Sequence, residues 1–178
     1  NMEINYNNTE FEESPPSHNL VESLRSCGYS FFSAMSDLID NSISANSNNI
    51  NVHMEWDNGE PWIAILDDGS GMSEEELSTN MKIGFKNPNE ERDQNDLGRF
   101  FCGMKLASFS MARQLSVFSK KGNHQLSFRQ WDLDIVSSKN KWLIGKRIPD
   151  WYDEFPEELK PKETGTLVVW RKCDHLLK

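Results

Sequence analysis

The sequence predicts an α+β two-layer sandwich, and three observations lead to that prediction. Apolar residues recur with helical spacing between residues 29 and 45. Apolar and polar residues then alternate from Ile50 to Trp56, as they do in a half-buried strand. The second half of the chain contains a run of further short strands. Helices followed by antiparallel strands favour a sheet covered by helices.

The size and composition indicate one folded domain. The chain has 178 residues, of which 37% are hydrophobic, and it includes ten Phe and six Trp. This length is sufficient for a single hydrophobic core. Residues 1–17 are polar and acidic and contain two prolines, so we expect a tail without a core of its own. An arm that crosses to a partner subunit is the alternative. Residues 18–178 are the expected folded domain.

Charge and cysteine usage limit the classes of function. The net charge of −9 argues against a broad nucleic-acid-binding face, which needs clustered Lys and Arg. No apolar run approaches the ~20 residues that span a bilayer, and the chain shows no secretion signal. Cys27, Cys102 and Cys173 form no Cys-x-x-Cys pair. We therefore expect a cytoplasmic protein with reduced thiols and no membrane partner.

The first helix and the first two strands follow from simple spacing. Between residues 29 and 45 an apolar stripe is formed by Phe32, Met35, Ile39 and Ile43, and Ala34 and Leu38 widen it. Asp57, Asn58 and Gly59 form a tight-turn signal, and residues 62–66 are the returning strand.

The later elements are marked by caps and turns. Ser73 with Glu76 three residues later is a capping box that begins a helix over about 73–82. Residues 84–97 are polar and turn-rich, and long loops of this kind are typically lids or disordered. A helix is expected from Gly103 to Ala112. Strands are expected at about 114–119, 124–132, 140–147 and 165–171.

An acidic, glycine-rich turn follows the strand that ends at Leu66. The carboxylate of Asp67 only accepts hydrogen bonds; the exocyclic amine of adenine donates, whereas guanine has a carbonyl there. Gly69 and Gly71 allow the backbone to approach a base, and Met72 offers apolar contact. The pattern therefore predicts an adenine site. An ordinary acidic turn is the alternative, because Asp-Gly turns are common.

Asp37 and Asn41 are four residues apart, so they share one face of the first helix. The carboxamide oxygen of Asn41 is a suitable Mg²⁺ ligand, since that ion takes oxygen ligands and keeps several waters. Asp37, one turn earlier, is placed to accept a proton from an attacking water. The polar stripe of an amphipathic helix is the alternative interpretation.

A third segment offers groups for phosphate binding. Gly98 and Gly103 bracket a turn that opens a helix, and helix N-termini bind anions. Lys105 is close enough to this turn to reach a phosphate, or is a solvated lysine. Thr166, at the start of a strand, is a candidate for the adenine side through a water molecule, although threonine is also a common strand residue.

These segments resemble the GHKL superfamily of ATPases, which includes gyrase, the cytosolic heat-shock chaperone, MutL and histidine kinases. Within it the chain looks most like the Microrchidia (MORC) and bacterial MORC-like group. The resemblance covers about residues 28–172. It rests on residues 34–45 around Asp37 and Asn41, on Asp67 to Met72, on Gly98-Arg99-Phe100, on Gly103 with Lys105, and on Trp131-Asp132-Leu133-Asp134.

The resemblance implies a Bergerat fold, with helices on one face of a mixed, mostly antiparallel sheet and Mg-ATP between the helices and a lid. By motif position Asn41 would hold Mg²⁺, Asp67 would contact adenine, Thr166 would support that contact and Asp37 would be the general base. The residues that would line the base are Gly69, Gly71 and Met72. Those that would hold phosphates are Gly98, Arg99, Gly103 and Lys105.

Two positions depart from the family pattern. Most members carry Glu where this chain has Asp37, whose shorter side chain sets the carboxylate back by about one methylene. Some bacterial MORC-like sequences also have Asp there. The phosphate turn usually has a middle glycine, and here Phe101 takes that place. A bulky residue disfavours φ > 0, so this turn takes another shape or its phosphate grip is altered.

The leading prediction is a Mg-ATP-binding, slowly hydrolysing switch domain that dimerises when ATP closes the lid. It would be the N-terminal module of a longer protein. DNA, or a helicase or nuclease partner, would be reached only through further domains, by analogy. One alternative is a nucleotide-dependent interaction module without catalysis. The other is the ATP domain of a histidine kinase, against which the short stretch before Asp37 argues.

Overall fold

A computed structural model describes the whole chain except residues 1–21, 24, 27–28, 58, 83–97 and 177–178. For residues 98–103 it describes the backbone alone. The predicted tail (1–17) and the predicted loop at 84–97 therefore lie outside the described residues.

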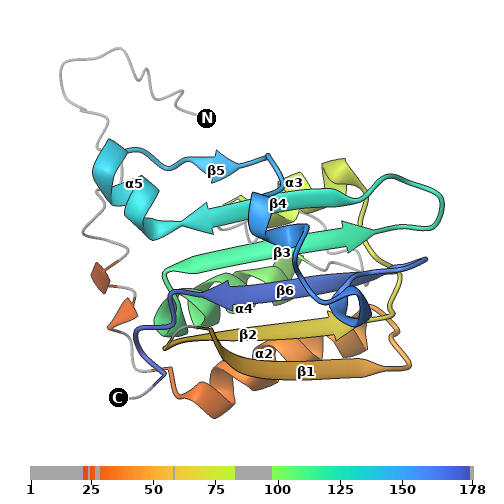
Figure 1. Cartoon of the computed structure of the whole chain (residues 1–178), viewed down its shortest axis with the longest axis horizontal. Helices are drawn as coiled ribbons and strands as arrows, with labels where there is room; N and C mark the ends of the chain where they lie inside the picture. The colour runs from red at the N-terminus through yellow and green to blue at the C-terminus, as the bar shows by residue number, and fades with distance from the viewer. Residues whose placement is uncertain (1–21, 24, 27–28, 58, 83–97, 177–178) are drawn as a thin grey trace, which may run out of the picture.

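The described chain forms a sheet of six strands in the order β1-β2-β6-β3-β4-β5 (Figure 1). All five pairings are antiparallel, so the mostly antiparallel sheet is confirmed, and no parallel pair occurs among the described strands. The strands are β1 (Ile50–Asp57), β2 (Glu60–Asp67), β3 (Gln114–Lys120), β4 (Ser127–Asp132), β5 (Ile144–Gly145) and β6 (Gly165–Arg171).

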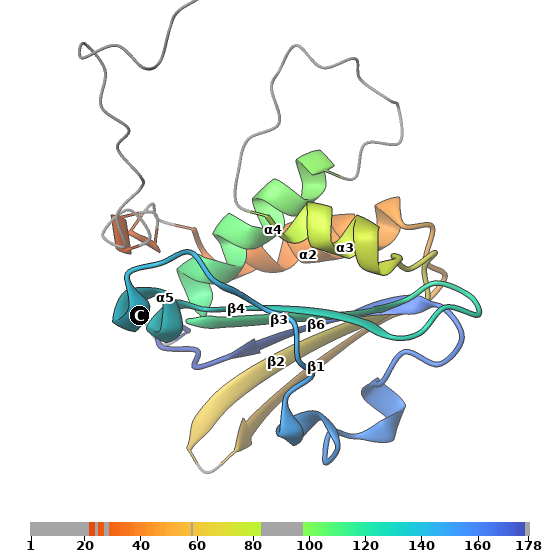
Figure 2. The ribbon, with the colours of Figure 1, turned by 90° about the horizontal axis from the view of Figure 1, so that it is seen from above.

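Three helices cover one face of this sheet, as the α+β sandwich requires. They are α2 (Phe31–Ser44), α3 (Glu74–Met81) and α4 (Gly98–Met111), and Figure 2 shows them together on one side of the strands. Their apolar faces meet those of β2, β3 and β6 in a core that includes Leu38, Ile65 and Val117. In the described part of the chain, no helix combines the length and apolarity needed to cross a membrane.

Helix α2 presents only part of its predicted apolar stripe to the core. Ser30 caps its N-terminus by accepting a hydrogen bond from the backbone N–H of Ser33. Ala34, Met35 and Leu38 are buried. Phe32 and Ile43, which the prediction placed in the stripe with Met35, are instead 80% and 58% exposed, so this part of the prediction is wrong. The apolar arc of α2 is therefore wider than the face that the sheet and α4 cover.

The sequence predicted the start of α3 correctly and the start of α4 incorrectly. The capping box of Ser73 and Glu76 is present in full, and α3 begins where it was predicted. Helix α4 begins at Gly98 instead of Gly103. The predicted turn between these glycines is thus wrong for the backbone described here, because the segment already forms the first turns of the helix.

The second face of the sheet carries a smaller apolar core. Residues from β2, β3, β4 and β6, including Trp62 and Phe118, pack against Tyr152, Phe155 and Leu159. The last three come from a segment that contains two 3₁₀ turns, η1 (Asp150–Tyr152) and η2 (Glu157–Leu159). Tyr152 stacks on Phe118 with ring centroids 4.1 Å apart. Both faces of the sheet are thus shielded, one by helices and one by an irregular aromatic segment (Figure 2).

The region after β4 differs from the prediction. A strand was expected at about 140–147, but β5 contains only Ile144 and Gly145, and α5 (Leu133–Lys139) precedes it. Asp132 caps this helix by accepting from the N–H of Asp134, and Asn140 ends it in the left-handed conformation. Asp at an N-cap and Asn after the last turn are ordinary helix boundaries, so the sequence did contain the signal.

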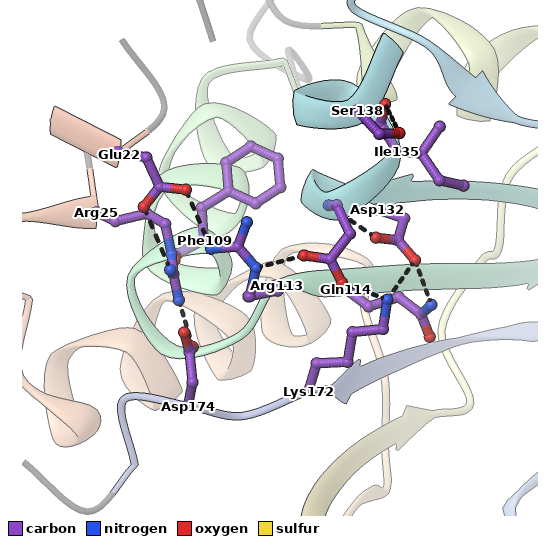
Figure 3. Close-up of polar contacts among 11 residues, drawn as sticks. Glu22, Arg25, Phe109, Arg113, Gln114, Asp132, Ile135, Ser138, Lys172 and Asp174 are labelled. Atoms are coloured by element: carbon purple, nitrogen blue, oxygen red, sulfur yellow. Dashed lines mark hydrogen bonds and ion pairs between the residues drawn. The ribbon is translucent and has the colours of Figure 1, made fainter. Parts of the chain in front are cut away.

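A charged network ties together the end of the sheet where β3 begins and β4 and β6 end. Arg113 donates to Asp134 and Glu22, and Lys172 donates to Asp132 and Asp134. Arg25 contacts Asp174 and also donates to the carbonyl of Phe109 near the end of α4 (Figure 3). These contacts join the first and last described segments of the chain to the body of the domain.

Candidate functional site

The opposite end of the sheet carries a row of polar side chains on the face covered by the helices. Asp67 pairs with Thr166, and Thr166 pairs with Ser119 on the next strand. Two residues deeper, the same row consists of Ile65, Val168 and Val117, which belong to the core. The change from apolar to polar marks the place where the core gives way to a site.

Asp67 is the centre of this row and is almost fully buried, with 6% of its surface exposed. One carboxylate oxygen accepts from the Ser42 hydroxyl at 2.8 Å. The other accepts from the backbone N–H groups of Gly69 at 2.9 Å and Thr166 at 3.2 Å. Burial raises the pKa of Asp67, and these three hydrogen bonds only partly counter that effect. The result is an oriented, desolvated acceptor.

The neighbouring hydroxyls fix the loop that follows Asp67. The hydroxyls of Thr166 and Ser119 lie 2.8 Å apart, and Ser119 Oγ accepts from the N–H of Met72 at 2.8 Å. Met72 is buried, with its side chain in the helix-side core. The polar row therefore orders both the acceptor and the apolar residue beside it.

Glycine is required at two positions of this loop. A Cβ on Gly69 would lie 2.8 Å from both Cβ and O of Ala45 at the end of α2. Gly71 has φ +65°, and a Cβ there would lie 1.8 Å from the carbonyl oxygen of Lys120. The loop thus passes close to α2 on one side and β3 on the other, and only a backbone without side chains fits.

Helix α2 brings Asn41 to the same place. Its Oδ1 and Nδ2 are both buried, and neither has a hydrogen-bond partner among the described residues. Buried polar atoms without partners are rare in folded proteins, and each one calls for an explanation. A ligand that supplies a donor or a cation to Oδ1, and an acceptor to Nδ2, would provide it.

Asp37 lies one turn before Asn41 on α2, as the spacing predicted, and is half-buried. Burial raises its pKa, and the charge of Asp40 raises it further. A carboxyl group whose pKa is moved toward neutrality accepts a proton more readily at physiological pH.

The structure brings five predicted residues to one pocket: Asn41, Asp67, Gly71, Met72 and Thr166. Gly69 does not line the pocket, but its backbone N–H donates a hydrogen bond to Asp67, which does. The pocket has a volume of about 30 Å³, which admits one or two water molecules. It is smaller than a purine base. Leu38 and Met104 also line it, so a bound base requires these apolar side chains to give way.

The predicted phosphate-binding residues are placed differently. Gly98, Arg99 and Gly103 belong to the first turns of α4. Lys105 is buried in the next turn, and its ammonium group donates to the carbonyls of Asn80 and Lys82. These carbonyls end α3, where a cation is favoured by the helix dipole. In this structure Lys105 therefore contacts the end of α3 and not the pocket.

The carboxamide oxygen of Asn41 has the chemistry of a magnesium ligand. The ion takes oxygen ligands and commonly only one or two from the protein, the rest being water and phosphate. The unpartnered carboxamide oxygen of Asn41 is such a ligand. The nearby carboxylate of Asp67 already accepts three hydrogen bonds, so its oxygens are less available to a metal ion than that of Asn41.

Sequence reasoning missed Ser42, Ser119 and Gly165. Ser42 directly follows Asn41, and Ser119 is the last residue on the helix-covered face of β3, where Leu115 and Val117 are apolar. Gly165 has φ +134°, and a Cβ there would lie 2.0 Å from the carbonyl oxygen of Asp67. A polar residue at the end of an apolar strand face was a detectable signal for Ser119. The close approach at Gly165 depends on strand pairing and was not.

Comparison with known proteins gives a consistent picture. A family model described as histidine kinase-, DNA gyrase B-, and HSP90-like ATPase matches residues 29–166. The chain is 29% identical over 146 residues to the DNA mismatch repair protein MutL of Dictyoglomus turgidum, covering 77% of this chain and 25% of that protein. It is 32% identical over 97 residues to MutL of Bacillus anthracis, covering 51% of this chain and 15% of that protein. The chain thus spans a quarter or less of these relatives.

Proposed function

The chain belongs to the histidine kinase-, DNA gyrase B- and HSP90-like ATPase family, and from this premise we propose that it is a Mg-ATP-binding switch domain. It hydrolyses ATP slowly, and closure of a lid over the nucleotide drives dimerisation and rearranges partner domains. The observation that carries the proposal is the pairing of the buried acceptor Asp67 with the unpartnered amide of Asn41 in one pocket.

Asp67 selects adenine in this proposal. Its carboxylate is held by donors from Ser42, Gly69 and Thr166, so its orientation is fixed before a base arrives. An ionised carboxylate accepts from the exocyclic amine of adenine and offers nothing to the carbonyl of guanine. Met72 and Met104 supply polarizable apolar surface beside the base.

Asn41 holds Mg²⁺ through its carboxamide oxygen. The ion, when bound, offsets the charge of the phosphate oxygens. The absence of a protein partner for Asn41 among the described residues supports this role. No described group competes for a hydrogen bond to its side chain, and the residue is positioned by helix α2.

Asp37 serves as general base and takes the proton of the attacking water. Its raised pKa supports this role. The phosphates lie toward the start of α4, with Gly98, Arg99, Gly103 and Lys105 as their partners. To reach a phosphate, Lys105 must exchange the carbonyls of Asn80 and Lys82 for it. Phosphate binding is then coupled to the end of α3.

A second candidate is a nucleotide-dependent interaction module without catalysis. The contact of Lys105 with the end of α3 favours it, as does the short Asp37 carboxylate. Both candidates leave DNA, or a helicase or nuclease partner, to further domains. The name of the MutL relatives, DNA mismatch repair protein, agrees with DNA contact through further domains. So does the resemblance to the Microrchidia group.

Calorimetry with ATP and Mg²⁺, together with a phosphate-release assay, tests the proposal. Asp67→Asn is expected to abolish ATP binding, because the amide puts a donor against the adenine amine in one rotamer and weakens the acceptor in the other. Asp37→Ala is expected to leave binding intact and to lower turnover by about 10²-fold or more. Unchanged affinity of the first variant would reject the adenine assignment. Binding without turnover in the unmodified protein would favour the interaction module.

A further inference from the structure

Strand β1 (Ile50–Asp57) is an edge strand with an exposed apolar face. Among the described strands it pairs with β2 alone, and it lies along one border of the sheet in Figure 1. Val52, Met54 and Trp56 are 42%, 56% and 58% exposed. They face the same side as Ile63 and Ile65, their neighbours on β2, and therefore lie on the helix-covered face.

Several usual protections of an edge strand are missing from β1, whose charged residues are the acidic Glu55 and Asp57. Natural edges are blunted by lysine, proline, bulges or very short strands. β1 has eight residues, pairs with β2 in unbroken register, and contains neither Lys nor Pro. A long, regular, apolar edge of this kind is a template for pairing with another strand.

Helix α2 extends the exposed apolar surface. Phe32 and Ile43 are eleven residues apart, about three helical turns, and lie on one face of the helix. Both side chains are exposed although α2 packs against α4, so they lie on a part of α2 that the described residues leave uncovered. Figures 1 and 2 place α2 over the β1–β2 border of the sheet. The same border thus exposes apolar side chains in both layers.

We propose that this border binds a second copy of the chain, with β1 pairing antiparallel to β1 about a two-fold axis at Met54. The sheets of the two copies join into one, and their α2 helices flank the junction. This surface is separate from the nucleotide pocket, and the association does not require nucleotide.

The sequence of β1 selects this arrangement. A two-fold axis perpendicular to the sheet keeps both sets of helices on one face, and facing residues must then point to the same side. The axis therefore passes through a residue and not between two. An axis at Met54 pairs seven residues of each strand and sets Val52 against Trp56 of the second copy, an aromatic and β-branched pair that sheets favour.

On the other face of the strand the same register sets an imidazole ring against a carboxylate, two groups that can share a hydrogen bond. It sets His53 against Glu55 of the second copy on both sides of the axis. These two groups already approach to 3.0 Å within one strand, between Nε2 and Oε2. An axis at His53 would place the two histidines against each other, and an axis at Glu55 would oppose two carboxylates, which destabilises a sheet.

Sedimentation equilibrium without nucleotide tests the proposal on the full chain. We expect a dimer whose dissociation constant rises at least tenfold in Met54→Lys, since a lysine then faces its own copy across the axis. Ile135→Lys is the matched control, because Ile135 is also an exposed apolar residue, 46% accessible on α5. It should leave the dimer unchanged.

The pairing of His53 with Glu55 gives a sharper test, in which a double variant keeps the composition of the strand. H53E sets carboxylates against each other and should weaken the dimer at least tenfold. The double variant H53E/E55H reverses the pair and should restore the affinity to within about threefold, where RT ln 3 is less than 1 kcal/mol. Circular dichroism confirms that each variant is folded.

Four results would overturn the proposal. One is a monomer at all micromolar concentrations, and another is a dimer indifferent to Met54→Lys. The third is a double variant that stays as weak as H53E. A dimer that appears only with ATP, and survives Met54→Lys, would also reject this surface while leaving the proposed ATP function intact.

Discussion

Asn41 carries the strongest single-residue argument, because no described residue offers a hydrogen bond to its buried side chain. A buried polar group without a partner costs about 1–3 kcal/mol, and both amide atoms of Asn41 are in that state. An apolar or smaller residue would suit the fold better at this position. A residue that destabilises its own domain is expected where a ligand completes it.

Asn41→Ala is therefore expected to have opposite effects on stability and on binding. Without nucleotide, the free energy of unfolding should stay equal or rise by about 1 kcal/mol, because the unsatisfied groups are removed. Affinity for ATP should fall more in the presence of Mg²⁺ than in its absence. Urea unfolding and calorimetry measure the two effects. An equal loss of affinity with and without the ion would show that Asn41 is not a ligand.

Asp67 is the reverse case, because its buried carboxylate already accepts hydrogen bonds from the protein. Three donors reach its two oxygens, and its burial leaves the pKa raised all the same. The fold thus holds an acceptor that water cannot solvate. Such a group gains more from one further donor than an exposed carboxylate does, which is the property an adenine site needs.

At the scale of elements, the loop from Asp67 to Met72 depends on glycine at position 71. We expect Gly71→Ala to destabilise the domain by about 3 kcal/mol or more, from backbone strain at φ +65° and from the clash with Lys120. Gly122→Ala is the matched control, since Gly122 has φ +55° but open space around it.

The control should lose only about 1 kcal/mol, the part due to the left-handed conformation alone. Chemical unfolding of both variants gives the comparison. If the two losses were equal, the close approach of the loop to β3 would not be a constraint, and the loop would be free to move away from that strand.

The charged network at the far end of the sheet predicts a dependence of stability on pH. Hydrogen bonds from Lys172, and then from Arg113, lower the pKa of Asp134 below its usual value of 3.8. A depressed folded-state pKa gives stability that is present above pH 3.8. That stability is lost as the pH falls through the lower folded value.

Asp134→Asn should therefore reduce stability at pH 7 by no more than about 1 kcal/mol, because Asp134 is half exposed. The difference between wild type and variant should shrink as the pH falls below 3.8 and vanish once the wild-type carboxyl is protonated. Urea titrations at pH 7, 4 and 2.5 follow it. A difference that grows on acidification would contradict the argument.

Local signals predicted the elements whose boundaries are set locally. The capping box at Ser73 placed α3, and alternation placed β1 and β2, with Asp67 as the last residue of β2. The expected strand at 140–147 failed because β5 pairs through only two residues, Gln130 with Gly145 and Trp131 with Ile144. How far a strand extends depends on the strand with which it pairs. The pairing of β5 with β4 could not be predicted from the local sequence.

The same reasoning explains the outcome at the site. Asn41, Asp67, Gly71, Met72 and Thr166 meet at one pocket, as expected from their motifs. Lys105 does not, because the carbonyls at the end of α3 attract its ammonium group. That contact comes from the packing of α3 against α4, which no spacing within either helix reveals.

At the scale of the whole molecule, the two faces and the two ends of the sheet carry different groups of residues. Its helix-side face ends in the polar row of Asp67, Thr166 and Ser119, and its other face is closed by the aromatic segment around Tyr152. The charged network holds the opposite end. The pocket therefore lies at the one end of the sheet where the helices, the loop after β2 and the start of β6 meet.

Binding at that pocket should stabilise the whole domain. A ligand that binds only the native state adds about 2.7 kcal/mol at a concentration of 100 times its dissociation constant. For a domain of this size that corresponds to a rise of roughly 5–10 °C in melting temperature. We expect ATP with Mg²⁺ to produce such a rise and GTP with Mg²⁺ to produce none, measured by differential scanning fluorimetry.

Asp67→Asn provides the control for that measurement, because it keeps the size and most hydrogen bonds of the side chain while changing its acceptor character. The variant should melt at the same temperature with and without ATP. Equal shifts by ATP and GTP would mean that the nucleotide is held by its phosphates alone. The buried carboxylate of Asp67 would then be a structural group of the β2 loop, and the base would lie elsewhere.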